Sequence, residues 1–370
     1  MSEKIDDINE FIKMTGEAHS VINYKIKIDN NNLIDYISLI KILSAFLVIL
    51  KHTNRKYWVF SDYWISTNII CSFCMCAVPL FSLCIGATLL NFNKRYSIYE
   101  YLKKRFNKMV IPIIGWNTIY YFYKVYIIKN LKRQDFNLIY LYDLYLCNKI
   151  FPLTYSLRVF MFGYMAIPLI AYIDMFNKIK IYSISFSLLL INTSTIPYFM
   201  KFFNDNRIRW PYNYNLGYII YLFAGYIIQN HKFNKKARIL IYVFGLLGLL
   251  SRIIISHYLT MKYKKPDRTQ IDYVNLPIVV YSCSIFLFVK EKSNNIFKII
   301  KKEHINTIGS LTMGPFFLHY IIIWGFFKLF NYNNEFSFIY RFYGAFIITI
   351  MCFIITFMMK KIPIIKNLVP

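Results

Sequence analysis

Acidic side chains are scarce in this chain of 370 residues. It has 18 Asp and Glu against 44 Lys and Arg, which gives a formal net charge of +26. Charged residues make up 17% of the chain, whereas about a quarter is usual in soluble proteins. Hardly any acidic group falls within the long apolar runs. This disfavours proton-coupled transporters and pumps, which depend on buried Asp or Glu relays.

The sequence also indicates neither a disulfide framework nor a cleavable leader. Four of the seven cysteines, Cys71, Cys74, Cys76 and Cys84, fall in one apolar run, where we expect them to act as small hydrophobic side chains. The Cys71-x-x-Cys74 pair has no second pair at ligand spacing, so no metal site is expected. The first 30 residues are polar, so we expect no cleavable signal peptide and expect the first apolar run to direct membrane insertion.

The positive charge does not indicate a nucleic-acid partner. The Lys and Arg residues form short clusters between apolar runs rather than one basic stripe or tail. No helix-turn-helix, zinc-finger or RNA-binding motif accompanies them. Basic clusters beside apolar segments are typical of membrane proteins, where they meet anionic headgroups and set the topology.

Long apolar runs are the main feature of the sequence. The chain is 57% hydrophobic, with a mean hydropathy of +0.40. Runs of about 18–25 residues recur, long enough for a helix to cross about 30 Å of hydrocarbon. The sequence therefore predicts an all-α, polytopic transmembrane bundle with about ten spans. The expected spans are 33–50, 68–90, 109–128, 157–175, 181–199, 216–228, 239–258, 274–289, 311–330 and 342–359.

The basic residues of alternate loops predict the orientation. One side collects residues 1–32, 94–108, 178–180, 232–238, 290–302 and 360–366, and the other collects 51–56, 129–149, 201–209, 262–268, 328 and 341. Roughly 24 basic residues on the first side against 16 on the second place the first side in the cytoplasm. We therefore expect both termini there, with a polar segment 1–32, one transmembrane domain 33–360 and a short tail 361–370.

Lys41 and His52 are the first candidate functional residues. They are eleven residues apart in the first span, so they differ by only about 20° around a helix and by roughly 16 Å along its axis. A titratable group in a bilayer is a functional candidate by default. The structural alternative is a Lys that extends to the interface and an interfacial His, and the residues alone leave both readings open.

Three further candidates lie beside or within later spans. Arg105 and Lys108 share a helix face before the third span and suit a phosphate group, although such clusters often serve only as topology anchors. His319 lies about ten residues into the ninth span, where it needs a hydrogen-bond partner and is either a cavity group or a contact between helices. We expect the other cations within spans, Lys124, Arg158 and Arg252, to extend toward the nearer membrane surface.

Four segments carry a family resemblance, and they occur in the family's order. Lys41 and His52 match a signature of a basic residue, ten residues and a histidine. The stretch from Pro79 to Gly86 is similar to Pro-Phe-Phe followed by Ser-Gly-Tyr-Leu-Leu. The stretch 101–112 is similar to Phe-x-x-x-Arg-x-x-Arg-x-x-x-Pro, and the stretch 308–319 to Ser-Leu-Gly-Ile-Tyr-Leu-Ile-His. The segment 164–168 also fits a family span, so the resemblance covers nearly the whole chain.

On these segments the chain resembles the acyltransferase type 3 family of bacterial integral-membrane O-acyltransferases. Some positions depart from the family's pattern. Lys108 replaces the second Arg, which keeps the charge but loses the planar guanidinium. Ile85 stands where the family has Ser before Gly86, and residues 153–155 replace a His-Leu-Trp.

The resemblance implies transfer of an acyl group, most often acetyl, from acyl-CoA to a hydroxyl of a cell-surface or exported polysaccharide at the bacterial inner membrane. It implies His52 as the general base and Lys41 beside a negative charge of the donor or the developing oxyanion. Arg105 and Lys108 would hold the CoA phosphates, and His319 would be a further cavity residue. Two alternatives stay open: a transporter or flippase for a lipid-linked sugar or polysaccharide, and a catalytically degenerate membrane component of a glycan-synthesis complex.

Overall fold

The computed structural model describes residues 35–54, 59–95, 97–128, 154–172, 178–202, 217–267, 272–330 and 339–370. These residues form helices and no strands. The polar N-terminal segment, the basic loop 129–149, residues 153 and 203–209, Trp58 and Trp210 lie outside the described residues, so the expectations placed on them stay predictions.

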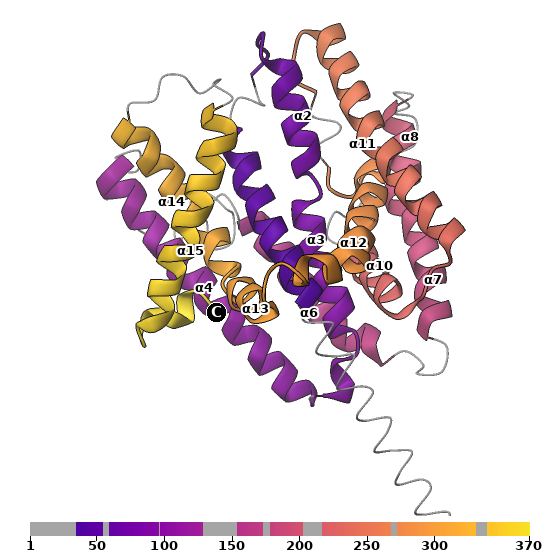
Figure 1. Cartoon of the computed structure of the whole chain (residues 1–370), viewed down its shortest axis with the longest axis horizontal. Coiled ribbons are helices and arrows are strands. Elements are labelled where there is room, and N and C mark those ends of the chain that lie inside the picture. Colours follow the sequence, from indigo (N-terminus) through magenta and orange to yellow (C-terminus); the bar gives the residue numbers. More distant parts are fainter. Residues whose placement is uncertain are drawn as a thin grey trace, which may run out of the picture.

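The helices follow the apolar runs. In chain order they are the first helix Asp35–Thr53, α2 Trp64–Cys74, α3 Ala77–Leu89, α4 Ile98–Phe122, α6 Thr154–Ala171, α7 Lys178–Leu189, α8 Ile196–Phe202, α10 Ile219–Asn230, α11 Lys235–Tyr263, α12 Leu276–Phe297, α13 Lys302–Ser310, α14 Met313–Phe330 and α15 Ala345–Lys361. Figure 1 shows α4, α14 and α15 at the left of the bundle, α7, α8 and α11 at the right, and α2 and α3 between them.

Each of the ten apolar runs coincides with helix in the structure, and the all-helical prediction is confirmed. Five described helices are long and apolar enough to cross a membrane by themselves. A sixth arises if α13 and α14, which meet at a bend of 62°, count as one broken span. The expected number of about ten spans and the cytoplasmic placement of both termini stay predictions.

Small residues allow α3 and α10 to approach closely. A methyl group added to Gly86 would overlap the main chain of Leu222, and one added to Gly225 would overlap the main chain of Leu83. The two glycines thus act reciprocally across one helix pair, as small residues commonly do where membrane helices pack. This contact fixes α3, which in turn packs against α6 and α12.

Polar contacts at one end of the bundle join segments from alternate loops. Asp35 at the start of the first helix accepts from Lys302 at 3.0 Å and from Asn306 at 2.7 Å. Arg238 pairs with Glu291 at 3.0 Å. Lys302, Arg238 and Glu291 belong to segments that the charge pattern places on one side, and Asp35 begins the span that follows residues 1–32. The contacts therefore support the predicted alternation of the chain.

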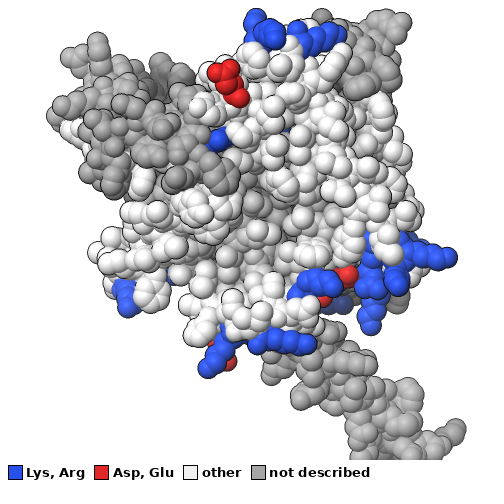
Figure 2. Space-filling model, turned by 45° about the horizontal axis from the view of Figure 1, so that its top comes forward, with Lys and Arg blue, Asp and Glu red and all other residues white. Residues whose placement is uncertain are grey.

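The other set of basic residues lies at the opposite end. Lys51, near the end of the first helix, donates to the Tyr273 hydroxyl at 2.6 Å, and Arg341 donates to Ser66 Oγ at 2.9 Å. Figure 2 shows most Lys and Arg side chains of the visible face in groups at the two ends, with largely uncharged surface between them. This distribution is typical of a protein embedded in a bilayer.

Candidate active site

His52 lies in the last turn of the first helix, where it is partly exposed. Its Nδ1 atom lies 2.8 Å from the hydroxyl of Tyr320 on α14, and the two rings are 4.7 Å apart. Within the described part of the chain, Nε2 of His52 forms no hydrogen bond. One edge of the imidazole is therefore held by protein, and the other is available to a reacting group.

His319 lies directly beside His52. The rings stack with centroids 5.1 Å apart and an angle of 29° between their planes. His319 is fully buried, and its Nδ1 lies 2.9 Å from the carbonyl oxygen of Pro315. Because a carbonyl oxygen can only accept, this contact assigns the proton to Nδ1 and leaves a lone pair on Nε2.

The Nε2 atom of His319 is buried and has no hydrogen-bond partner among the described residues. Buried polar atoms are normally satisfied by protein or by ordered water. This acceptor next to His52 is therefore suited to receive a hydrogen bond from a water molecule or a substrate hydroxyl. The two histidines and Tyr320, which we call the histidine cluster, thus form one polar site between the first helix and α14.

Sequence reasoning named both histidines but gave no role to Tyr320. The only signal was its position next to His319. That signal is weak, because adjacent residues on a helix point about 100° apart and do not normally contact the same partner. Tyr320 reaches His52 because the first helix passes α14 on that side. An aromatic run continues from it, since the rings of Tyr320 and Trp324 lie 5.6 Å apart and those of Trp324 and Tyr123 lie 5.9 Å apart.

Lys41 lies away from the histidine cluster. It is eleven residues before His52 in the same continuous helix, so the rise of the helix separates the two by roughly 16 Å. Among the described residues it forms no hydrogen bond or ion pair. Its charge lies near Lys108 of α4, where burial lowers the pKa of the Lys108 ammonium and the charges of Arg105 and Lys41 lower it further. The structure therefore groups Lys41 with the basic segment of α4.

That basic segment belongs to a well-capped helix. Ser97 precedes α4 and accepts a hydrogen bond from the backbone N–H of Glu100 at 3.2 Å, which satisfies an otherwise free donor of the first turn. The N-terminal half of α4 is thereby fixed, with Arg105 and Lys108 three residues apart. At this position burial lowers the pKa of Lys108, and the positive charges of Arg105 and Lys41 lower it further.

Arg105 is held by two aromatic rings. Its guanidinium carbon lies 5.6 Å from the ring centroid of Tyr101 and 5.5 Å from that of Tyr164. The Tyr101 hydroxyl donates to the Tyr164 main-chain oxygen at 3.1 Å, which joins α4 to α6. The Nε atom of Arg105 is buried with no hydrogen-bond partner in the described chain. A guanidinium positioned in this way suits a phosphate group.

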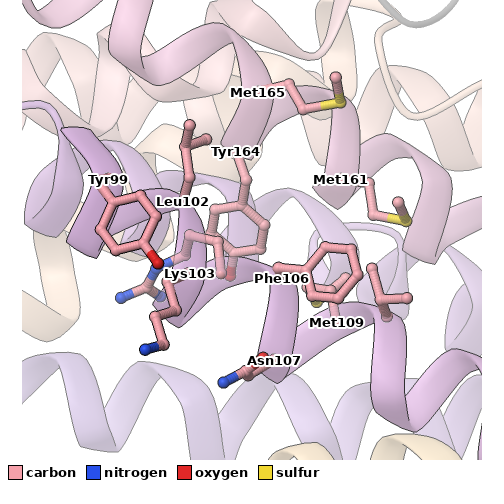
Figure 3. Close-up of a pocket in the computed structure, with 11 residues that line it drawn as sticks. Tyr99, Leu102, Lys103, Phe106, Asn107, Met109, Met161, Tyr164 and Met165 are labelled. Carbon is pink, nitrogen blue, oxygen red and sulfur yellow. The ribbon is translucent and has the colours of Figure 1, made fainter.

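A cavity of about 540 Å³ lies beside Arg105, between α4 and α6. Figure 3 shows Tyr99 and Lys103 toward one end of it and Phe106, Met109 and Met161 toward the other. Its lining is mainly apolar, and no acidic side chain takes part. The histidine cluster does not line this cavity.

Arg252 differs from the expectation that it would extend toward a membrane surface. Only 1% of it is exposed, and its Nη1 atom donates to the Ser72 hydroxyl. Nearby, Asn68 donates to the main-chain oxygen of Ile253 at 2.9 Å. Arg252 therefore joins α11 to α2 inside the bundle, and its role here is to fix two helices.

The fold and the site together define an all-helical membrane protein with a polar histidine cluster near one end of the first helix and the cations Lys41, Arg105 and Lys108 toward the other. A family model described as an acyltransferase domain matches residues 34–358. The chain therefore belongs to the acyltransferase type 3 family, and the resemblance found in the sequence is confirmed. Neither the curated proteins nor the solved structures include a match to this chain.

Proposed function

We propose that the chain moves an acyl group, most simply acetyl, from acyl-CoA to a hydroxyl of a cell-surface or exported polysaccharide, in the bacterial inner membrane. Membership of the family supports a membrane acyltransferase. The observation that carries the finer proposal is the separation of two kinds of site along the first helix. Lys41 lies near the cations of α4, and His52 lies in the histidine cluster.

The donor would enter at the end that holds Arg105 and Lys108. These residues suit the phosphates of CoA, because cationic donors form the strongest hydrogen bonds with phosphate oxygens. Lys41 lies too far from His52 to assist the reacting carbonyl directly, so we assign it to negative charge on the donor. The pantetheine arm would then extend along the first helix and bring the thioester toward His52.

His52 would act as the general base. An acceptor hydroxyl, whose pKa lies far above 7, must lose its proton as its oxygen attacks the thioester carbonyl. Nε2 of His52 takes that proton, the new C–O bond forms, and the C–S bond breaks as the tetrahedral intermediate collapses. The proton then passes from the imidazolium to the departing thiolate, so that free CoA and the ester leave with a neutral histidine restored.

Tyr320 would determine which nitrogen of His52 is basic. Nε2 can accept a proton only if Nδ1 carries the other one, so Nδ1–H must donate to the Tyr320 oxygen. His319 would accept a hydrogen bond from a water molecule or from a second, non-reacting hydroxyl of the acceptor through its free Nε2 lone pair. The reacting hydroxyl would donate to Nε2 of His52 and would thus be aligned for attack before the donor arrives.

Labelled acetyl-CoA and purified protein provide the test. We expect acceptor-dependent release of CoA by the native chain and its loss in His52→Ala. His231→Ala is the matched control, because His231 is an exposed histidine beyond the end of α10. Both variants must insert and purify as the native chain does.

The outcomes separate this proposal from its rivals. Normal ester content of the surface glycan in cells that carry only His52→Ala would contradict the assignment of the base. No thioester turnover by the native chain with acetyl-, succinyl- or longer acyl-CoA would favour the degenerate component of a synthesis complex. Movement of a lipid-linked sugar across vesicles without turnover would favour the flippase.

A further inference from the structure

The cavity between α4 and α6 opens on an apolar face of the bundle. At its rim Leu102 is 45% exposed, Phe106 58% and Met165 68%. Just beyond it, Leu169 of α6 is 80% exposed. Met165 and Leu169 fall within the expected span 157–175, where exposed apolar side chains meet lipid tails rather than water. The cavity is therefore accessible from the bilayer.

The two ends of the cavity differ in chemistry. Tyr99 and Lys103 lie toward one end, and Phe106 and Met161 toward the other (Figure 3). The Lys103 ammonium lies 6.0 Å from the ring centroid of Tyr99 and forms no ion pair within the described chain. Methionine side chains adapt their shape to irregular apolar ligands. The lining thus suits a molecule with an anionic head and a hydrocarbon tail.

We propose that this cavity binds one anionic phospholipid, with its phosphate at Lys103 and one acyl chain beside Met161 and Met165. About 540 Å³ lies within the range of about 300–1,000 Å³ that is usual for specific small-molecule sites. Juxtamembrane basic clusters attract anionic headgroups, and here such a cluster lies directly beside an apolar cavity. The lipid chain would pack against the α4–α6 wall that holds Arg105.

The acyl group of a CoA donor is a poorer occupant. The reacting thioester must come to the histidine cluster, and that cluster does not line this cavity. The cavity lies instead beside the cations that would bind the phosphate end of the donor. The lipid proposal does not depend on the acyltransferase reaction, because it concerns binding alone, but the cavity borders the proposed donor site, since Arg105 also lines it.

Native mass spectrometry of the detergent-purified full chain tests the proposal. Equal amounts of dioleoyl phosphatidylglycerol and dioleoyl phosphatidylcholine are added. We expect one tightly retained phosphatidylglycerol, favoured about fivefold or more over phosphatidylcholine, as one basic group near a charged headgroup can produce. Equal retention of the two lipids by the native chain would overturn the proposal.

Two pairs of variants locate the site. Met165→Trp fills the rim of the cavity, and Leu169→Trp places the same ring one turn away on the same helix, outside the lining. Lys103→Gln removes the cation at the cavity, and Lys104→Gln removes its exposed neighbour, which does not line it. We expect retention to fall several-fold in the first member of each pair and to stay unchanged in the second.

Further outcomes decide the identity of the occupant. An equal loss of lipid retention in the cavity variants and their controls would show that the lipid binds the general surface. That result would overturn the proposed site. Displacement of the retained lipid by acetyl-CoA would assign the cavity to the donor and would also overturn the proposal. Leu102→Trp is a second filling variant, used if Met165→Trp lowers the unfolding temperature relative to Leu169→Trp.

Discussion

The Tyr320 hydroxyl lies 2.8 Å from Nδ1 of His52, although the two residues are 268 positions apart in the chain. This contact joins the first helix to α14 at the point where the imidazole of His52 also stacks on His319. It leaves Nε2 of His52 as the nitrogen that can meet a substrate. In the proposed function Tyr320 would orient His52 as a general base, a relationship found in catalytic triads built on unrelated folds.

Tyr320→Phe should slow acyl transfer while it leaves donor binding intact. Without the hydroxyl, Nδ1 no longer has an acceptor, and the imidazole is free to rotate or to change tautomer. We expect kcat to fall by about tenfold or more, a part of the roughly 10²–10⁴-fold that general-base catalysis contributes. The KM for acyl-CoA should stay the same.

Tyr123→Phe is the control for this prediction, because Tyr123 belongs to the same aromatic run but contacts Trp324 rather than a histidine. A purely structural role of Tyr320 would lower the unfolding temperature and change kcat and KM together. Equal kcat values for Tyr320→Phe and the native chain would show that the hydroxyl does not orient the base.

His319→Asn and His319→Gln should differ. The Asn amide can replace the Nδ1–H donor to the Pro315 carbonyl, whereas the Gln amide extends to the position of Nε2. If the lone pair on Nε2 binds the acceptor, Asn should preserve the unfolding temperature but raise the KM for the acceptor several-fold. Gln should lower the unfolding temperature more, because a buried carbonyl loses its partner.

Acceptor titrations at saturating acetyl-CoA measure the first effect, and thermal unfolding in detergent measures the second. Unchanged acceptor kinetics in a folded His319→Asn variant would restrict His319 to contacts between helices. That is the structural reading that the residues alone left open.

The sequence predicts the helices and the separate candidates, but it does not predict which candidates meet. Apolar length is a local property, so each of the ten runs is found as helix. Helical phase placed Lys41 and His52 on one face, yet the rise of the helix keeps them apart. The meeting of His52 with His319 and Tyr320 depends on how the first helix packs on α14, which no local pattern encodes. Four short motifs in order predict the family, and the family model that matches residues 34–358 confirms it.

Arg105→Ala should weaken binding of the donor more than binding of the acceptor. Loss of a charged hydrogen bond costs about 1.5–3 kcal/mol, so we expect the KM for acetyl-CoA to rise about tenfold or more. Lys108→Ala should act in the same direction, while Lys108→Arg should keep or improve donor binding because a guanidinium pairs with phosphate in two places. Steady-state titrations of acetyl-CoA at fixed acceptor measure these effects.

Lys104→Gln serves as the control within the same basic segment, because the Lys104 side chain is exposed. If Lys104→Gln and Arg105→Ala raise the donor KM equally, the segment acts only through its total charge. If neither does, the segment is a topology anchor and the donor binds elsewhere.

Gly86→Ala and Gly225→Ala should each destabilise the bundle. A methyl group at either position would overlap the backbone of the partner helix, at Leu222 or Leu83, and backbone cannot rotate away as a side chain can. Overpacking of this kind typically costs about 1–3 kcal/mol.

Gly325→Ala is the matched control, because an added methyl group at Gly325 of α14 meets no atom within 4 Å. In the control, replacing a helical glycine should leave stability unchanged or raise it slightly. Thermal unfolding of the three variants in one detergent measures the effect, and equal unfolding temperatures would show that α3 and α10 are not packed as closely as the structure places them.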